Sequence, residues 1–220
     1  MWDMGEIPMP GGWLLSMAWM PMCGQSWYGA AAAFVGMWAG MMVAMMLPSL
    51  VPMLWRWRPA LAALAGVGYF LVWTALGLAV FAAGAAFAQA ALQVPALARA
   101  VPMSLALVVL LAGAFQFTAW KAHHLARCRP ASARGLAPPA HAGAAWRYGV
   151  RLGLHCSFAC AGLTAILVAI GVMDLRAMVM VAAAITAERL APAGQRVAWA
   201  VGAVSIVTGV YLMARAAWLL

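Results

Sequence analysis

The stretch Phe34-Val-Gly-Met-Trp-Ala-Gly-Met-Met-Val-Ala-Met-Met-Leu47 is apolar throughout and holds five of the 17 methionines of this 220-residue chain. With its apolar flanks it reaches the roughly 20 residues that an α-helix needs to cross a bilayer. Thioethers are soft, uncharged sulfur donors that suit Cu(I), and they cost less to bury in hydrocarbon than carboxylates or thiolates. The stretch therefore predicts a membrane helix and points to a metal.

Composition extends the membrane assignment to the whole chain. Hydrophobic residues make up 68% of the sequence and charged residues only 8%, which excludes a soluble domain. We predict an all-α, polytopic transmembrane helical bundle. About six spans are expected, at residues 29–54, 60–92, 103–120, 149–171, 173–190 and 196–219.

The net charge of +9 follows membrane topology, because the basic residues flank apolar spans instead of forming one patch. A nucleic-acid partner is therefore not expected. Ten Lys and Arg residues fall on one side of the predicted spans and three on the other. The ten are Arg56, Arg58, Lys121, Arg127, Arg129, Arg134, Arg147, Arg151, Arg189 and Arg196, and the three are Arg99, Arg176 and Arg215. This bias predicts that the segment 121–151, with its Pro-, Ala- and Arg-rich loop at about 125–145, faces the cytoplasm.

The same topology divides the chain into an external tail, residues 1–28, and a transmembrane domain, residues 29–220. The tail is rich in Met, Pro, Gly and Trp, which predicts irregular or interfacial structure. Two interpretations stay open, an apolar segment lying in the interface and a soft-metal loading loop. The loading loop would use Met17, Met20, Met22 and Cys23. Because the tail lacks the charged leader of a signal peptide, either it crosses unaided or a further span precedes it.

Methionines on the first span form one candidate metal wall. At 100° per residue Met37, Met41 and Met45 share an arc, whereas Met42 and Met46 point elsewhere. Two flanking features favour a close-packed, kinked helix there, the Gly-xxx-Gly step at 36–40 and the prolines at 48 and 52. The alternative is that methionine fills gaps in transmembrane packing.

A second candidate lies in the fourth span, where Cys156 and Cys160 share a helical face and His155 flanks them. Two thiolates and an imidazole suit Cu(I), Zn(II) or an iron centre. Residues four apart on one helix are poorly placed for a disulfide, so reduced thiols are expected. The alternative is a packing stripe of small residues. Its members are Gly149, Gly153, Cys156, Cys160 and Thr164.

Further donors are expected at the cytoplasmic boundary. If the third helix continues to residue 130, His124 and Cys128 lie one turn apart and provide half a metal site; otherwise they belong to a solvated basic helix end. Glu188 is a candidate functional acid because an acid at the edge of a span is costly. Its alternative is neutralisation by Lys121 or Arg189.

These blocks, in order, resemble a family of bacterial integral membrane proteins of unknown function that are predicted to bind metal. The resemblance rests on Met37-Trp-Ala-Gly-Met-Met-Val-Ala-Met-Met-Leu-Pro48 with Pro52-Met53, Gln116-Phe-Thr118 with Lys121 and Cys128-Arg-Pro130, and Gly153-Leu-His-Cys156 through Cys160, Gly171-Val-Met173 and Glu188-Arg189. It covers roughly residues 34–190 and implies a multi-span fold, a metal and a bacterial inner membrane. It also implies, from the helix that commonly precedes the methionine-rich external loop in that family, a missing upstream span.

The chain departs from the family pattern at three places. The family has cysteine at the position of His124, paired cysteines at Ala159 and Cys160, and lysine at Arg189. Histidine keeps a donor but Ala159 removes one, so a site of four thiolates is not expected.

The leading hypothesis is an integral membrane protein that binds a soft transition metal, with copper favoured, for transfer, insertion or homeostasis. It implies the lipid bilayer and a metal donor or acceptor protein as partners. Alternatives are a channel or transporter for a non-metal substrate and a metal- or haem-dependent membrane oxidoreductase. The sequence does not decide whether the chain is an enzyme or what its oligomeric state is.

Overall fold

A computed structural model describes residues 6–10, 12–21, 24–129, 139–172 and 174–218. The described chain is almost entirely helical, with seven α-helices and one short hairpin. Five helices are long and apolar enough to cross a membrane, by length and composition: α1 (Trp27–Leu54), α2 (Pro59–Gln93), α3 (Pro95–Phe115), α6 (Ala142–Ile170) and α8 (Gly194–Trp218). The all-α class is confirmed, and the apolar helices fit the predicted bundle.

Two shorter helices complete the bundle, α4 (Ala119–Cys128) and α7 (Leu175–Leu190). The fifth predicted span corresponds to α7, whose 16 residues reach only about 24 Å along its axis. The third span, expected at residues 103–120, corresponds to α3, which begins earlier, at Pro95, and ends earlier, at Phe115. The chain then turns, and Thr118 caps α4 by accepting a hydrogen bond from the Lys121 backbone N–H at 3.2 Å. The helix therefore breaks before His124, yet His124 and Cys128 still lie one turn apart.

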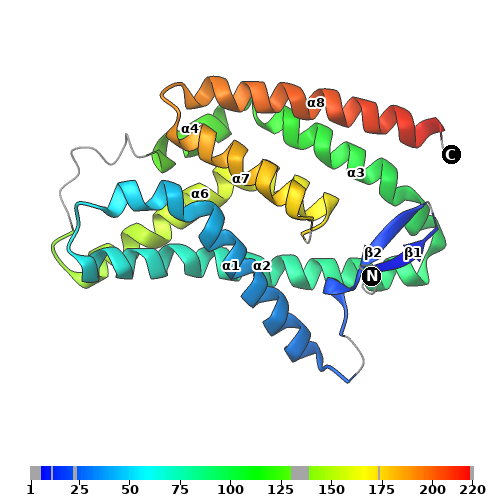
Figure 1. The fold of residues 1–220 in the computed structure, drawn as a ribbon, viewed down its shortest axis with the longest axis horizontal. Coiled ribbons are helices and arrows are strands. Elements are labelled where there is room, and N and C mark those ends of the chain that lie inside the picture. The colour runs from blue at the N-terminus through cyan, green and yellow to red at the C-terminus, as the bar shows by residue number, and fades with distance from the viewer. Residues whose placement is uncertain (1–5, 11, 22–23, 130–138, 173, 219–220) are drawn as a thin grey trace.

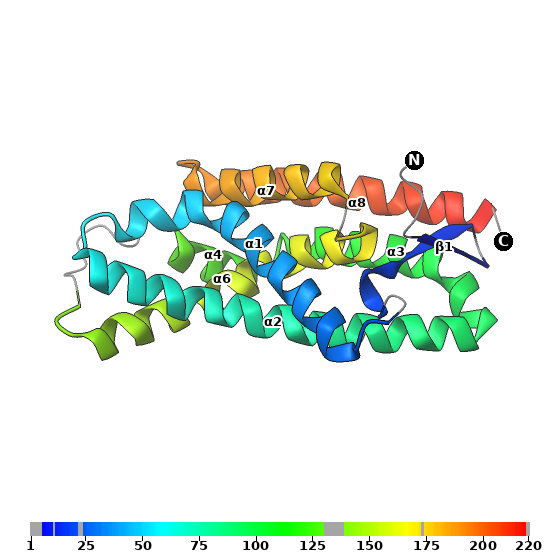
Figure 2. The same cartoon turned by 60° about the horizontal axis from the view of Figure 1, so that its bottom comes forward.

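Helices α2 and α8 run along the long axis of the molecule, whereas α1 crosses it obliquely (Figure 1). α3 packs along α8 and α2 packs along α6, while α1 contacts both α2 and α7. Figure 2 shows α7 and α8 on one side of the molecule and α2 on the other. The start of α2, the start of α6 and the start of α8 all lie at one end, opposite the hairpin (Figure 1).

The close contact between α2 and α6 depends on glycine. A Cβ added at Gly149 would collide with the backbone of Ala65, and one at Gly153 would lie 2.9 Å from the carbonyl oxygen of Tyr69. The small-residue stripe is thus a helix interface along its glycine half. This interface brings Tyr69 of α2 against Cys156 of α6.

The buried face of α1 is broader than the predicted arc. The buried methionines include Met42 and Met46, which were predicted to point away from the arc, as well as Met41 and Met45. The expectation that Gly36 and Gly40 admit a close neighbour is wrong within the described chain, where no atom lies within 4 Å of a Cβ built there. Both prolines lie inside the helix, which changes direction along its length (Figure 1).

The tail is more regular than predicted. Strands β1 (Glu6–Met9) and β2 (Trp13–Ser16) pair antiparallel, with Met9 opposite Trp13. A short 3₁₀ helix, Met17–Trp19, follows. The hairpin is held at the corner between α2 and α3, where the Trp13 indole N–H donates to the carbonyl of Ala98 at 2.8 Å. Two of the predicted tail ligands, Met22 and Cys23, lie outside the described residues.

Candidate metal centre

Three sulfur atoms from two helices meet inside the bundle. The thiols of Cys156 and Cys160, one turn apart on α6, have Sγ atoms 3.9 Å apart. The thioether of Met46, on α1, lies 3.9 Å from the Cys156 Sγ. All three side chains are buried, with exposed fractions of 2% or less. We call Cys156, Cys160 and Met46 the sulfur cluster.

A tyrosine and an arginine complete the surroundings of the cluster. The Tyr69 hydroxyl donates to the Cys156 Sγ at 2.9 Å. The Arg189 guanidinium donates to the Cys156 Sγ at 3.2 Å and to the Met46 Sδ at 3.4 Å. Its second amino group donates to the carbonyl of Cys128 at 3.3 Å. One amino group of the guanidinium therefore points at sulfur atoms contributed by two other helices, and the other points at a backbone carbonyl.

Cys128 supplies a third buried thiol beside the cluster. It ends α4 and has no exposed surface. Hydrogen bonding with Cys156, followed by burial, raises the pKa of the Cys128 thiol well above its ordinary value. All three described cysteines are free thiols, as the spacing of Cys156 and Cys160 predicts.

The acid next to Arg189 is paired with a different cation. Glu188 accepts a hydrogen bond from the Lys121 ammonium at 2.7 Å, and Gln116 also accepts from Lys121. All three residues are only 1% exposed. The neutralisation of Glu188 by Lys121 was one of the two sequence-based interpretations. Within the described part of the chain no carboxylate forms an ion pair with Arg189.

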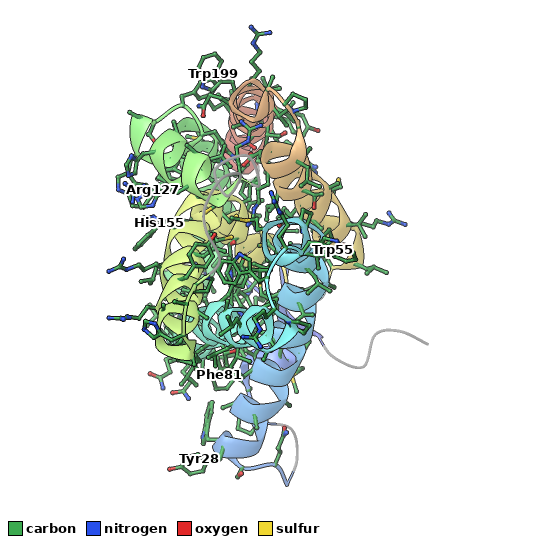
Figure 3. All side chains as sticks on the ribbon, turned by 90° about the vertical axis from the view of Figure 1, so that its left-hand side faces the viewer. Tyr28, Trp55, Phe81, Arg127, His155 and Trp199 are labelled. Carbon is green, nitrogen blue, oxygen red and sulfur yellow. The ribbon has the colours of Figure 1, made fainter. Side chains whose placement is uncertain are left out.

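A pair of histidines lies at the rim of the same helices. The Nδ1 atoms of His124 on α4 and His155 on α6 are 2.9 Å apart. An Arg127 amino group approaches the His155 Nε2 at 3.4 Å, and Figure 3 shows these two side chains together at one edge of the molecule. Burial, and then the charges of His123 and Arg127, lower the pKa of His124.

The structure thus brings together most of the predicted donors, but in two groups. Cys156, Cys160 and Cys128 meet inside the bundle, and His124 and His155 meet at its edge. Met41 and Met45 belong to the hydrophobic core, but the thioether against Cys156 is that of Met46. Among the described residues, no three His, Cys, Asp or Glu side chains are gathered tightly enough to hold a metal ion by themselves.

Three residues of the site were missed by the sequence reasoning in these roles. Met46 was placed on the wrong side of α1, Tyr69 was read as part of a span, and Arg189 was considered only as a partner of Glu188. One signal was available for Arg189, since a cation inside an apolar helix is costly and demands a partner. Nothing local in the sequence identifies that partner as a thiol.

Comparison with known proteins gives a family for this arrangement. The model of the PpoB2 copper chaperone family matches residues 35–212, so the chain belongs to that family. The matched range includes every residue of the sulfur cluster, Tyr69, Arg189 and the histidine pair. Neither the curated proteins nor the solved structures gave a match.

Proposed function

As this chain is a member of a copper chaperone family, we propose that it is an integral membrane protein that carries Cu(I) as cargo in the sulfur cluster and passes it to an acceptor protein. The membrane setting is supported by five helices with the length and apolar composition of spans. The excess of basic residues at one set of helix ends supports an orientation with those ends in the cytoplasm. The bacterial inner membrane fits this orientation.

The observation that carries the proposal is the environment of Arg189. Its side chain is 1% exposed, and a buried guanidinium is strongly destabilising unless an anion compensates it. Glu188 is held by Lys121, so Arg189 contacts the Cys156 thiol, the Met46 thioether, the Tyr69 hydroxyl and one backbone carbonyl. The cluster is therefore built to hold a negative charge that resides on sulfur.

Charge balance favours a monovalent metal. Two cysteine thiolates carry two negative charges, so binding one Cu(I) leaves a single negative charge, which Arg189 neutralises. A divalent ion such as Zn(II) on the same thiolates would leave Arg189 uncompensated. In a buried site of low dielectric this difference matters more than it would in water.

The donor set also favours copper in its reduced state. Thiolate and thioether sulfur are the ligands that Cu(I) prefers, and Met46 adds a thioether that contributes no charge. Cys128 offers a further thiol at the edge of the cluster. Met41 and Met45, which the sequence favoured as ligands, are assigned to packing in this proposal.

Metal analysis of the purified protein tests the proposal. Under anaerobic, reducing conditions we expect one tightly bound copper per chain, with sulfur neighbours by X-ray absorption, and replacement of Cys156 and Cys160 by serine should remove this sulfur-bound copper. Thr164→Ser, on the same face of α6 and also buried, is the matched control and should keep its copper. If the double serine variant folds with wild-type helical content and retains copper with the wild-type sulfur neighbours, the cluster is not the site.

A further inference from the structure

The contact between α4 and α6 repeats one arrangement of donors at two depths. Each helix presents one histidine at the rim, His124 and His155, and one cysteine in the interior, Cys128 and Cys156. The histidines are partly exposed, whereas the cysteines have no exposed surface. Nitrogen donors therefore lie outside and sulfur donors inside along the same helix pair.

We propose that His124 and His155 form a second Cu(I) site, a transfer site through which copper passes between the sulfur cluster and a separate acceptor molecule. This inference rests on the proposed function of the sulfur cluster. It adds a separate nitrogen site and a route for the cargo. The acceptor is defined only by its chemistry, a soluble protein or small molecule that offers thiolate or imidazole donors.

The geometry of the pair suits a two-coordinate metal. The two Nδ1 atoms lie 2.9 Å apart, a distance at which one imidazole N–H can donate a hydrogen bond to the other ring. Two metal–nitrogen bonds of about 2 Å each would need the nitrogens about 4 Å apart in a linear arrangement. Because both rings are partly exposed, a small rotation of each provides that separation.

Aromatic side chains and a cation limit what the pair can bind. The ring centroids of Trp120 and Phe158 lie 4.5 Å and 5.2 Å from that of His124, so the His124 imidazole has apolar neighbours. Arg127 approaches the far nitrogen of His155 and disfavours a highly charged ion. Neutral imidazole with a cation nearby favours Cu(I) over a divalent metal.

Short steps connect the two sites. His155 and Cys156 are consecutive, and His124 and Cys128 are separated by one helical turn. In the transfer step one Cu–N bond breaks as one Cu–S bond forms. The thiol proton moves to the imidazole that is released, and copper stays Cu(I), so no oxidant or reductant is required. Transfer outward is the reverse exchange.

The first experiment measures transfer kinetics with the Cu(I) chelator bicinchoninate as acceptor. In His124→Gln/His155→Gln, which keeps side-chain volume but removes both imidazoles, we expect one tightly bound copper as in the wild type. The rate of copper removal should fall about tenfold or more, the usual effect of losing groups that support a metal site. His123→Gln changes an exposed histidine on the same helix and should transfer at the wild-type rate. An unchanged or faster rate in the double variant would overturn the transfer role.

The second experiment observes the nitrogen site without the cluster. Cys128→Ser/Cys156→Ser/Cys160→Ser loaded with Cu(I) should show two nitrogen neighbours at about 2 Å by X-ray absorption, and adding the two glutamine changes should abolish them. Absence of nitrogen-bound copper in the triple serine protein would refute the second site and leave the sulfur cluster standing. Nitrogen-bound copper there, with no sulfur-bound copper in the wild type, would refute the cluster and leave the histidine site standing.

Discussion

Substitutions of Arg189 test whether its positive charge supports Cu(I) binding. Arg189→Gln removes the counter-charge of a bis-thiolate Cu(I) complex inside a poorly solvated site, so the affinity for Cu(I) should fall about tenfold or more. Arg189→Lys keeps the charge and should retain most of the affinity. Competition with a Cu(I) chelator measures both. A folded glutamine variant that binds copper as tightly as the wild type would show that charge balance does not hold the metal.

Two adjacent methionines of α1 offer a matched pair of substitutions. Met46→Leu removes the thioether 3.9 Å from Cys156, whereas Met45→Leu changes a buried neighbour with no role in the proposed cluster. Both swaps nearly conserve volume and should cost less than about 1.5 kcal/mol of folding free energy. Chelator competition should show weaker Cu(I) binding for Met46→Leu only. The opposite result, weaker binding for Met45→Leu and for Met41→Leu, would restore the arc that the sequence favoured.

At the scale of helices, the packing of α6 on α2 positions Tyr69 and Cys156 for each other. Gly149→Ala would push a methyl group into the Ala65 backbone and should destabilise the protein by about 1–3 kcal/mol. Copper binding should weaken as the interface opens. Gly143→Ala, near the start of the same helix, meets its nearest atom at 3.7 Å and should leave the melting temperature unchanged or raised. Thermal unfolding followed by circular dichroism measures the stability of both variants. If Gly149→Ala is as stable as Gly143→Ala, the helices can shift to accept the added methyl group.

Helices were predictable where the apolar pattern has clear ends. The second span, expected at 60–92, is α2 at Pro59–Gln93, because a proline opens it and polar residues flank it. The break after Phe115 was missed because Phe117 and Trp120 continue the apolar pattern, although Thr118 is a typical N-cap residue. The tail hairpin was missed for a similar reason. Its turn includes Gly12 at φ +74°, a conformation that favours glycine, but the Met- and Trp-rich composition suggested irregular structure.

The site was predictable only as far as it is local. Cys156 and Cys160 share a face because they are four residues apart, and periodicity is enough to show that. The contact of Arg189 with Met46 joins residues 143 positions apart and depends on how α7 lies against α1. Helical periodicity constrains which residues share a face, but it does not say which face meets which neighbour. The choice of Met46 over Met45 was therefore beyond the sequence.

Across the whole molecule, the donors gather toward one end. Cys128 ends α4, Arg189 lies in the last turn of α7, and Met46 lies in the second half of α1, so the cluster sits toward the end that carries most basic residues. The orientation that the charge bias supports would place that end, and the histidine pair at its rim, on the cytoplasmic side. Copper would then be exchanged with a cytoplasmic partner. The orientation of the protein in the membrane therefore decides on which side copper is exchanged.

Orientation can be measured by labelling introduced cysteines in intact cells. Cys128, Cys156 and Cys160 are buried and should stay unreactive, and Cys23→Ser removes the remaining native thiol. In that background Gln25→Cys, an exposed position just before α1, should react with a membrane-impermeant maleimide. His141→Cys, an exposed position just before α6, should react only after permeabilisation, because the excess of basic residues predicts that segment 121–151 faces the cytoplasm. Labelling of His141→Cys in intact cells, with Gln25→Cys protected, would invert the orientation and place the histidine pair on the outer side, so that copper would be exchanged with an external donor or acceptor.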